Sequence, residues 1–159
     1  MADAGKKPTG VEKFIAAAND LGFPVVVRTM DQSTHTATEA AAAVGCEVGA
    51  IVKSLLFLAD GAPLLVLASG PNRVDTEILG RLLGARVAMS DARGVKAATG
   101  YSIGGVPPFG HPEPLRTVID ADLLRYEVVW AAAGSATAVF SIEPDTLIEL
   151  TAGEVAPVS

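Results

Sequence analysis

The sequence predicts one α+β domain with a mixed, mostly antiparallel sheet that curls into a barrel-like shape with helices around it. Helices with clear ends are interleaved with short apolar strands, but their order lacks the regular alternation of a Rossmann-type sheet. A chain of 159 residues has the size of one ordinary domain and can bury its own core. We expect residues 1–8 to form a flexible tail and residues 9–159 to form the domain.

The helices are predicted from the residues at their ends. Thr9 with Glu12, and Thr36 with Glu39, can form capping boxes that satisfy two backbone N–H groups reciprocally. Glycines that follow the predicted helices favour the left-handed conformation that ends a helix. The expected starts are Thr9, Thr36, Asp75, Ser90 and Pro144, and the expected stops are Gly22, Gly45, Gly84 and Gly100.

Strands are expected in the apolar runs between these helices, at 25–29, 50–58, 64–68, 86–89, 115–120, 126–132 and 137–142. Asp60-Gly61 is typical of a tight hairpin, which would pair the second and third runs antiparallel. The last three runs follow one another with short gaps, so we expect an antiparallel meander there.

The charge balance limits the classes of partner. A net charge of −6 argues against a protein that coats DNA or RNA through bulk electrostatics. A local basic patch is still compatible with it, although an ordinary solvated surface is the favoured interpretation. Candidates for such a patch are Arg73, Arg81, Arg86, Arg93 and Lys96.

The sequence also predicts the cellular compartment. No apolar run reaches the roughly 18 residues needed to cross a bilayer, and residues 1–8 lack the apolar segment of a signal peptide. The single cysteine, Cys46, cannot form an internal disulfide and is expected to be a structural thiol. We therefore expect a cytoplasmic protein with no membrane partner.

Lys53 is the most informative residue. It is the only charge in the apolar run 50–58. Burying an unpaired charge costs several kcal/mol, so Lys53 must reach water at a sheet edge or serve in a lined pocket. A pocket lysine suggests an anionic or carbonyl-bearing ligand.

The segment from Gly104 to Gly110 could supply the other wall of that pocket. Its glycines let backbone amides approach a ligand, and its prolines restrict the loop. Such a loop can present N–H groups to a carbonyl or an oxyanion. A structural corner and a ligand loop are equally compatible with these residues.

No conventional hydrolytic set is visible. The two histidines, His35 and His111, lie in no metal-binding or nucleophile-elbow pattern. His35 is most simply a helix-entry residue, and His111 follows the glycine loop. We therefore expect no metal and no cofactor, and catalysis would depend on positioning, backbone dipoles and Lys53.

The order and spacing of five short motifs resemble the YbaK/EbsC family of aminoacyl-tRNA deacylases, related to the inserted editing domain of bacterial prolyl-tRNA synthetase. The resemblance covers about residues 25–151. The motifs are Ser33-Thr34-His35-Thr36 with Glu39 and Gly45, Ile51-Val52-Lys53-Ser54-Leu55, Arg73-Val74-Asp75, Thr99-Gly100-Tyr101, and Gly104-Gly105-Val106-Pro107-Pro108-Phe109-Gly110.

The resemblance implies a free-standing trans-editing enzyme that hydrolyses the ester of a mischarged tRNA. It also implies a mixed sheet that closes around a pocket, without a protein nucleophile or a metal. The terminal ribose hydroxyl of the tRNA, or a substrate thiol, would assist instead. The implied catalytic residues are Lys53, Gly104 and Gly105, and the implied substrate-binding residues are Ser54, Val106, Pro107, Pro108, Phe109, Gly110, His35 and Gly134.

Departures from the family pattern leave the edited amino acid open. Ala133-Gly134-Ser135-Ala136-Thr137 stands where many members carry a glycine-rich basic turn, and Ser54 stands where some subgroups carry asparagine. Small residues such as Ala, Ser, Thr or Cys are all compatible. Two rival hypotheses are a non-catalytic module that binds tRNA or a synthetase, and a hydrolase of small esters or amides.

Overall fold

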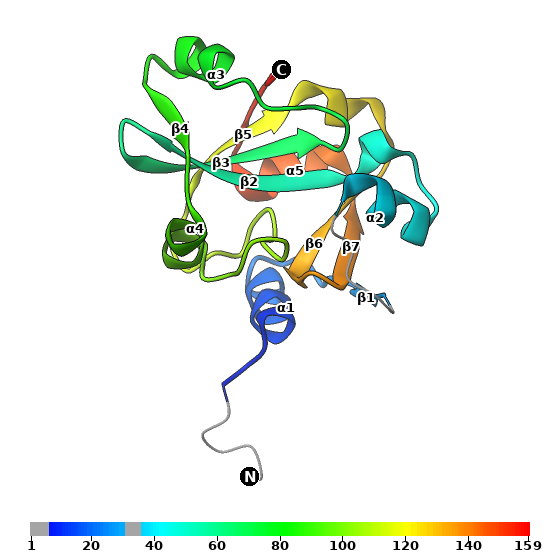
Figure 1. Ribbon diagram of the computed structural model, residues 1–159. Helices are drawn as coiled ribbons and strands as arrows, with labels where there is room; N and C mark the ends of the chain where they lie inside the picture. The colour runs from blue at the N-terminus through cyan, green and yellow to red at the C-terminus, as the bar shows by residue number, and fades with distance from the viewer. Residues whose placement is uncertain (1–6, 31–35) are drawn as a thin grey trace.

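The computed structural model describes residues 7–30 and 36–159, which form two sheets and the helices around them (Figure 1). The larger sheet has the strand order β4 (Val87–Met89), β2 (Val52–Ala59), β3 (Ala62–Ser69), β5 (Arg116–Asp120) and β8 (Glu154–Ala156). The smaller sheet has the order β1 (Arg28–Thr29), β7 (Ala138–Ile142) and β6 (Val129–Ser135). The helices are α1 (Gly10–Asp20), α2 (Ala37–Val44), α3 (Thr76–Leu83), α4 (Ala92–Thr99) and α5 (Pro144–Thr151), with short 3-10 turns η1 (Val48–Ala50) and η2 (Ala121–Arg125).

The predicted α+β class and the mixed, mostly antiparallel pairing are confirmed. β2 pairs antiparallel with β3 and β4, and β7 pairs antiparallel with β1 and β6. β5 runs parallel to both β3 and β8. A single bridge between Ile51 and Trp130 connects the two sheets, and the described strands do not close into a barrel.

Most helix ends lie where the sequence predicts them. Both capping boxes are present at Thr9 and Thr36, and the Asp75 side chain accepts hydrogen bonds from the first turn of α3. The fourth helix is capped by Asp91, not by Ser90, because the Asp91 carboxylate accepts from Gly94 N. The Ser90 N–H donates instead to Leu56 O at 3.1 Å and continues the contact between β4 and β2.

The strand predictions succeed for the hairpin and for the antiparallel pairing of β6 with β7, and fail for β5, the first strand of the predicted meander. β2 and β3 pair along their whole length, as Asp60-Gly61 predicts. β5 does not join a meander with β6 and β7, because its two edges pair with β3 and β8. Both of its faces are also covered, since Val118 and Ile119 are fully buried in different clusters. Such double burial is typical of a parallel strand inside a sheet. In the first predicted strand only Arg28–Thr29 pairs, and β8 was not predicted.

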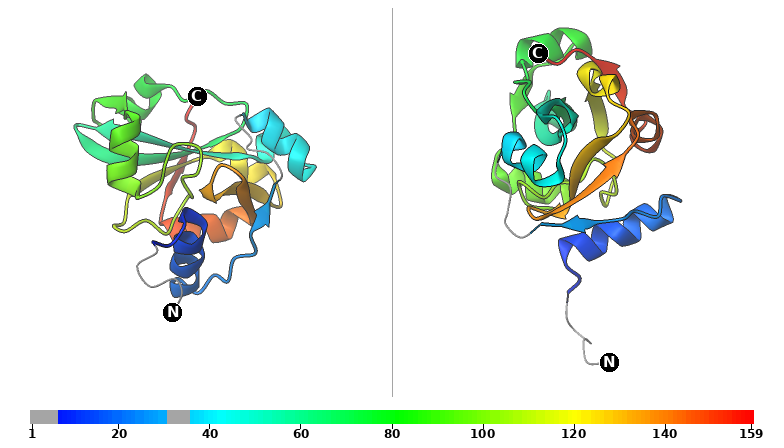
Figure 2. Two further views of the ribbon diagram at one scale, coloured as in Figure 1. Left: turned by 60° about the horizontal axis from the view of Figure 1, so that its bottom comes forward. Right: turned by 90° about the vertical axis from the view of Figure 1, so that its right-hand side faces the viewer.

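The core lies on both faces of the larger sheet. One cluster contains Phe57, Leu64, Val66 and Val118, and α3 covers it through Leu79. The other cluster fills the space between the two sheets and includes the contacting rings of Phe14, Phe109 and Phe140. Phe14 comes from α1, which packs against β6 (Figure 2). Over residues 7–30 and 36–159, no helix has the length and apolar character required to span a bilayer.

Candidate functional site

A cavity of about 350 Å³ lies at the N-terminal half of β2, between the larger sheet, the smaller sheet and the Gly104 loop. This volume is within the usual range of small-molecule sites. Its lining is mostly apolar and contains many small side chains. The lining residues are Thr36, Ala37, Ala40, Ile51, Val52, Lys53, Ser54, Leu55, Leu56, Met89, Ser90, Val95, Ile103, Gly104, Val106, Trp130, Ala131, Ala132, Ser135, Ala136, Ala138 and Val139.

Four of the predicted site residues line this cavity: Lys53, Ser54, Gly104 and Val106. Lys53 is the only charged residue among the described lining residues. The lysine strand and the glycine loop, about fifty residues apart in the sequence, therefore form two walls of one cavity. His35 lies outside the described residues.

The other predicted residues support the cavity from outside its lining. The Gly105 N–H donates to Ser102 O at 3.0 Å and is already engaged in a turn. Gly134, at a φ of 103°, packs against the backbone of Gly10. The loop residues Pro108, Phe109 and Gly110 line a second cavity of about 330 Å³, which is bounded by α1 and α5.

Contacts from behind fix the Gly104–Gly110 loop. Pro107 O lies 2.8 Å from His111 Nε2, and the Tyr101 hydroxyl donates to Gly110 O at 3.3 Å. Burial lowers the pKa of His111, and the hydrogen bond to Pro107 opposes this effect only in part. The neutral ring therefore donates its Nε2–H to Pro107 O and leaves the loop ordered.

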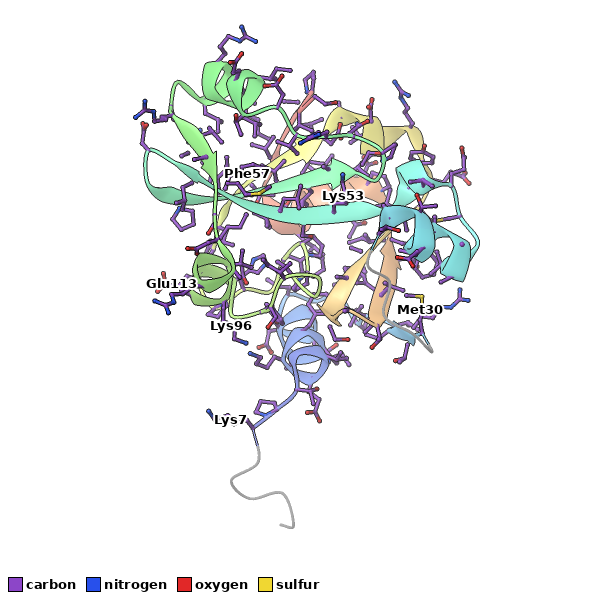
Figure 3. The ribbon with its side chains drawn as sticks, in the orientation of Figure 1. Lys7, Met30, Lys53, Phe57, Lys96 and Glu113 are labelled. Atoms are coloured by element: carbon purple, nitrogen blue, oxygen red, sulfur yellow. The ribbon has the colours of Figure 1, made fainter. Side chains whose placement is uncertain are left out.

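Lys53 leans from β2 toward the segment that follows β3 (Figure 3). Its Nζ donates to Asn72 O at 2.6 Å. Partial burial lowers the pKa of Lys53, and the negative charge of Asp120 opposes that change. The amine thus has one fixed hydrogen bond and two further N–H groups that a ligand can accept.

A network of buried polar groups lies behind Asn72. The Asn72 amide Nδ2 donates to Asp120 Oδ2 at 2.8 Å and to Asp122 Oδ2 at 2.7 Å. Asp120 is only 1 % exposed and also accepts from Ser69 N and Asp122 N. These bonds hold the segment after β3 against the end of β5.

The edge of β2 is open where it meets the cavity. Leu56 O accepts from Ser90 N, and Asp60 N donates to Arg86 O, so the even-numbered residues of β2 direct their backbone polar groups toward β4. β4 pairs only with Phe57–Ala59, and no described strand pairs with residues 53–55 on this side. The N–H and C=O of Ser54 therefore face the cavity side of the sheet. A bound ligand can use them as a donor and an acceptor.

Ser54 adds a second polar feature. Its Oγ is buried and has no hydrogen-bond partner among the described residues. A buried hydroxyl without a partner costs about 1–3 kcal/mol, and such a cost is typical of positions whose partner is a ligand.

Large apolar side chains stand at the mouth of the cavity. Met89 and Ile103 are 66 % and 62 % exposed although both line the cavity. Trp130 forms another part of the wall, with the Arg28 guanidinium 6.0 Å from its ring centroid. These flat or flexible apolar surfaces suit contact with a planar group such as a nucleobase.

The lining provides no protein nucleophile activated by a base. It contains hydroxyls from Thr36, Ser54, Ser90 and Ser135, but no histidine, carboxylate or cysteine among its described residues. Cys46 lies elsewhere, and burial together with Glu47 raises the pKa of its thiol. Lys53, backbone groups and hydroxyls are thus the polar groups available to a substrate.

Sequence reasoning missed Asn72, Asp120, Met89 and Trp130. Trp130 is the single tryptophan of the chain, and Asp120 is a carboxylate at the last position of a buried strand. Both were usable signals. Asn72 and Met89 gave none, because only the folded chain brings them to Lys53 and to the cavity mouth.

Comparisons with known proteins identify the family of this chain. Residues 31–150 match the family model of the aminoacyl-tRNA editing domain. The chain is 30 % identical over 130 residues to the uncharacterised protein YwhH of Bacillus subtilis (strain 168), covering 81 % of this chain and 83 % of YwhH. It is 26 % identical over 128 residues to a protein of Enterococcus faecalis (strain ATCC 700802 / V583) named "Putative Cys-tRNA(Pro)/Cys-tRNA(Cys) deacylase EbsC", covering 79 % of this chain and 78 % of EbsC.

A solved structure extends the agreement to the whole fold. The crystal structure of "a putative trans-editing enzyme for prolyl tRNA synthetase" superposes with a TM-score of 0.91 at 41 % identity, over 97 % of this chain and 99 % of that one. The family model alone spans most of the chain, including Lys53 and the Gly104 loop. This chain belongs to the aminoacyl-tRNA editing domain family.

Proposed function

We propose that this protein is a free-standing deacylase that hydrolyses the ester bond of mischarged tRNA carrying a small amino acid such as Ala, Ser, Thr or Cys. The observation that carries the proposal is the cavity, in which Lys53, the open edge at Ser54 and the Gly104 loop meet within the editing domain. The names of EbsC and of the trans-editing structural relative point to the same reaction class.

The cavity suits the aminoacyl end of a tRNA. Six alanines contribute to its wall, which leaves space but supplies few polar groups; they come from α2, β6, β7 and the β6–β7 turn, namely Ala37, Ala40, Ala131, Ala132, Ala136 and Ala138. A pocket of this kind admits small aminoacyl groups and discriminates weakly between side chains that differ by one methylene. Met89, Ile103 and Trp130 at the rim provide apolar surface for the terminal adenosine.

The proposed chemistry relies on positioning and on fixed electrostatics. An aminoacyl ester is already activated, so an oriented hydroxyl or water and a stabilised oxyanion suffice for hydrolysis. Lys53, as an ammonium, polarises the ester carbonyl or binds the terminal phosphate, while the backbone N–H of Ser54 faces the same space and Gly104 lines it. The terminal ribose hydroxyl of the substrate assists the attack, since the described lining holds no protein base.

The test is deacylation of tRNA charged in turn with Ala, Ser, Thr, Cys and Pro. Wild type is compared with Lys53→Ala and with Arg81→Ala, which removes a cation from α3, outside the cavity lining. We expect release of one or more small amino acids, lost in Lys53→Ala and retained in Arg81→Ala. Intact charged tRNA in every wild-type reaction would contradict the proposal. Binding of charged tRNA without release would support a non-catalytic module, and tRNA-independent cleavage of simple aminoacyl esters would support a small-ester hydrolase.

The proposed partners are the aminoacyl-tRNA acceptor end and, as a second candidate, a synthetase. The name of the structural relative, a trans-editing enzyme for prolyl-tRNA synthetase, supports the second candidate.

A further inference from the structure

The position of the Lys53 amine is set by the backbone of another residue. Its hydrogen bond to Asn72 O is 2.6 Å long and crosses from β2 to the segment between β3 and α3. This segment has no regular secondary structure, yet Asn72 is attached at both its backbone and its side chain. The Asn72 N–H donates to Ser69 O at 2.9 Å, and its side-chain amide is shared between two carboxylates.

Asp120 is the more buried of these two carboxylates. At 1 % exposure it accepts from Ser69 N at 3.0 Å, Asp122 N at 3.0 Å and Asn72 Nδ2 at 2.8 Å. The one ion pair among the described residues joins Arg125 to Asp122. No cation among the described residues therefore forms an ion pair with Asp120. A buried carboxylate is costly unless hydrogen bonds and a nearby cation offset its desolvation. Lys53 is the cation with which Asp120 interacts through space.

From this arrangement we infer that Asp120 and Asn72 are positioning residues for Lys53. Asn72 fixes the site of the amine through its carbonyl oxygen, and Asp120 fixes Asn72. The inference rests on the proposed function, because it assigns these residues to the placement of the lysine that acts on the ester.

The same geometry selects between the two possible forms of Lys53. A lysine that acts as a base must be neutral, which requires strong desolvation without a nearby anion. Partial burial lowers the pKa of Lys53, but the amine donates to a carbonyl and stands near a buried carboxylate, and both interactions oppose that change and favour the ammonium. Lys53 therefore serves as a fixed positive charge for the substrate and not as a proton acceptor.

The first test measures Lys53 directly and needs no substrate. The pKa of the Lys53 side chain is followed by NMR of its ¹³Cε signal, assigned by its loss in Lys53→Arg, in wild type, Asp120→Asn and Asp122→Asn. Asp122→Asn is the matched control, because it makes the same change two residues away on a side chain that is 39 % exposed. We expect the pKa of Lys53 to fall by about half a unit or more in Asp120→Asn, since an opposite charge is removed, and to change less in Asp122→Asn. An unchanged pKa in a folded Asp120→Asn protein would overturn the inference.

The second test measures positioning through the reaction. Asn72→Ala removes the side-chain tether but keeps the backbone carbonyl. We expect kcat for deacylation to fall about tenfold or more while KM changes less than about threefold, because the loss is one of orientation. An unchanged kcat in Asn72→Ala would overturn the inference. If Asp120→Asn does not fold, the kcat of Asn72→Ala is the measurement that tests the inference. If the wild-type protein shows no deacylase activity, the proposed function fails. The inference about Asp120 and Asn72 is still tested in that case, because the NMR measurement does not depend on deacylation.

Discussion

At the scale of single residues, the site depends on groups that hold other groups in place. Lys53 is held by Asn72, and the Gly104–Gly110 loop is held by His111 and Tyr101. His111 contacts the loop from the side opposite the first cavity, since it lines the second one. Its role is to order Pro107 and not to touch a substrate in the first cavity.

His111 makes the stability of the protein depend on pH. Burial lowers its pKa in the folded state below the ordinary value of about 6.5, so the unfolded chain binds the proton more readily. The stability that the neutral ring provides is complete above the unfolded pKa and is lost as the pH falls from there toward the folded pKa.

We predict that His111→Gln reduces the loss of stability on acidification. Glutamine keeps an N–H donor near Pro107 O but does not titrate. The free energy of unfolding from urea titrations at pH 7.5 and 5.5 should fall less in the variant, by at most about 1.4 kcal/mol for each pH unit. Equal losses in the two proteins would show that His111 is not the titrating group.

At the scale of elements, three segments meet behind the loop. α1 begins at Gly10 against Gly134 near the end of β6, and Gly105 packs against Ser135, the last residue of the same strand. Phe14 of α1 contacts Phe109 of the loop at a centroid distance of 5.4 Å. α1 precedes residues 31–150, the part matched by the family model, yet it completes the packing of the loop.

A substitution at Gly134 tests the contact between α1 and the end of β6. This glycine has a φ of 103°, and an added Cβ would come within 2.6 Å of the Gly10 carbonyl carbon. We predict that Gly134→Ala destabilises the fold more than Gly61→Ala does. Gly61, at a φ of 85°, shares the backbone strain but has nothing within 4 Å of an added Cβ.

The extra loss in Gly134→Ala should be about 1–3 kcal/mol in the free energy of unfolding, the usual cost of overpacking. Urea denaturation of both variants measures it. Equal destabilisation of the two variants would mean that only backbone strain matters. The contact between α1 and the end of β6 would then relax without cost.

At the scale of the whole molecule, an acidic protein has to bring a polyanion to its cavity. The cations of the predicted patch are distributed over the segment before α3, α3 itself, the residue before β4, and α4, namely Arg73, Arg81, Arg86, Arg93 and Lys96. Lys96 instead converges with Lys13 of α1: both amines donate to Gly100 O, at 3.3 and 3.1 Å. Neither forms an ion pair with a carboxylate in the part of the chain that the structure describes. Gly100 precedes the Gly104–Gly110 loop by four residues, so this pair of charges lies at the segment that leads into the loop.

We predict that the lysine pair contributes to binding of the tRNA backbone. With charged tRNA as substrate, the slope of log kcat/KM against log salt should become shallower by about one in Lys13→Ala and in Lys96→Ala. Arg81→Ala on α3 is the control and should keep the wild-type slope. A slope that is unchanged in both lysine variants would place the tRNA elsewhere.

Local signals in the sequence were sufficient for most of the elements and for two walls of the cavity. Capping boxes, glycine stops and the Asp60-Gly61 turn depend on residues close in the chain, so the helices and the β2–β3 hairpin were predictable. Lys53 was visible because a charge inside an apolar strand is costly unless the fold provides for it. The glycines and prolines of the loop similarly indicated a restricted backbone before any contact was known.

The tertiary structure decided what depends on contacts between distant segments. The parallel pairing of β5 with β3 and β8, the separation into two sheets and the open edge at Ser54 follow from strand neighbours, which no local pattern encodes. Asp120 and Lys53 lie 67 positions apart in the chain, and only the pairing of β3 with both β2 and β5 brings their charges together. The sequence by itself therefore determined most of the elements and the lysine, whereas the folded chain determined which carbonyl and which buried carboxylate hold that lysine in place.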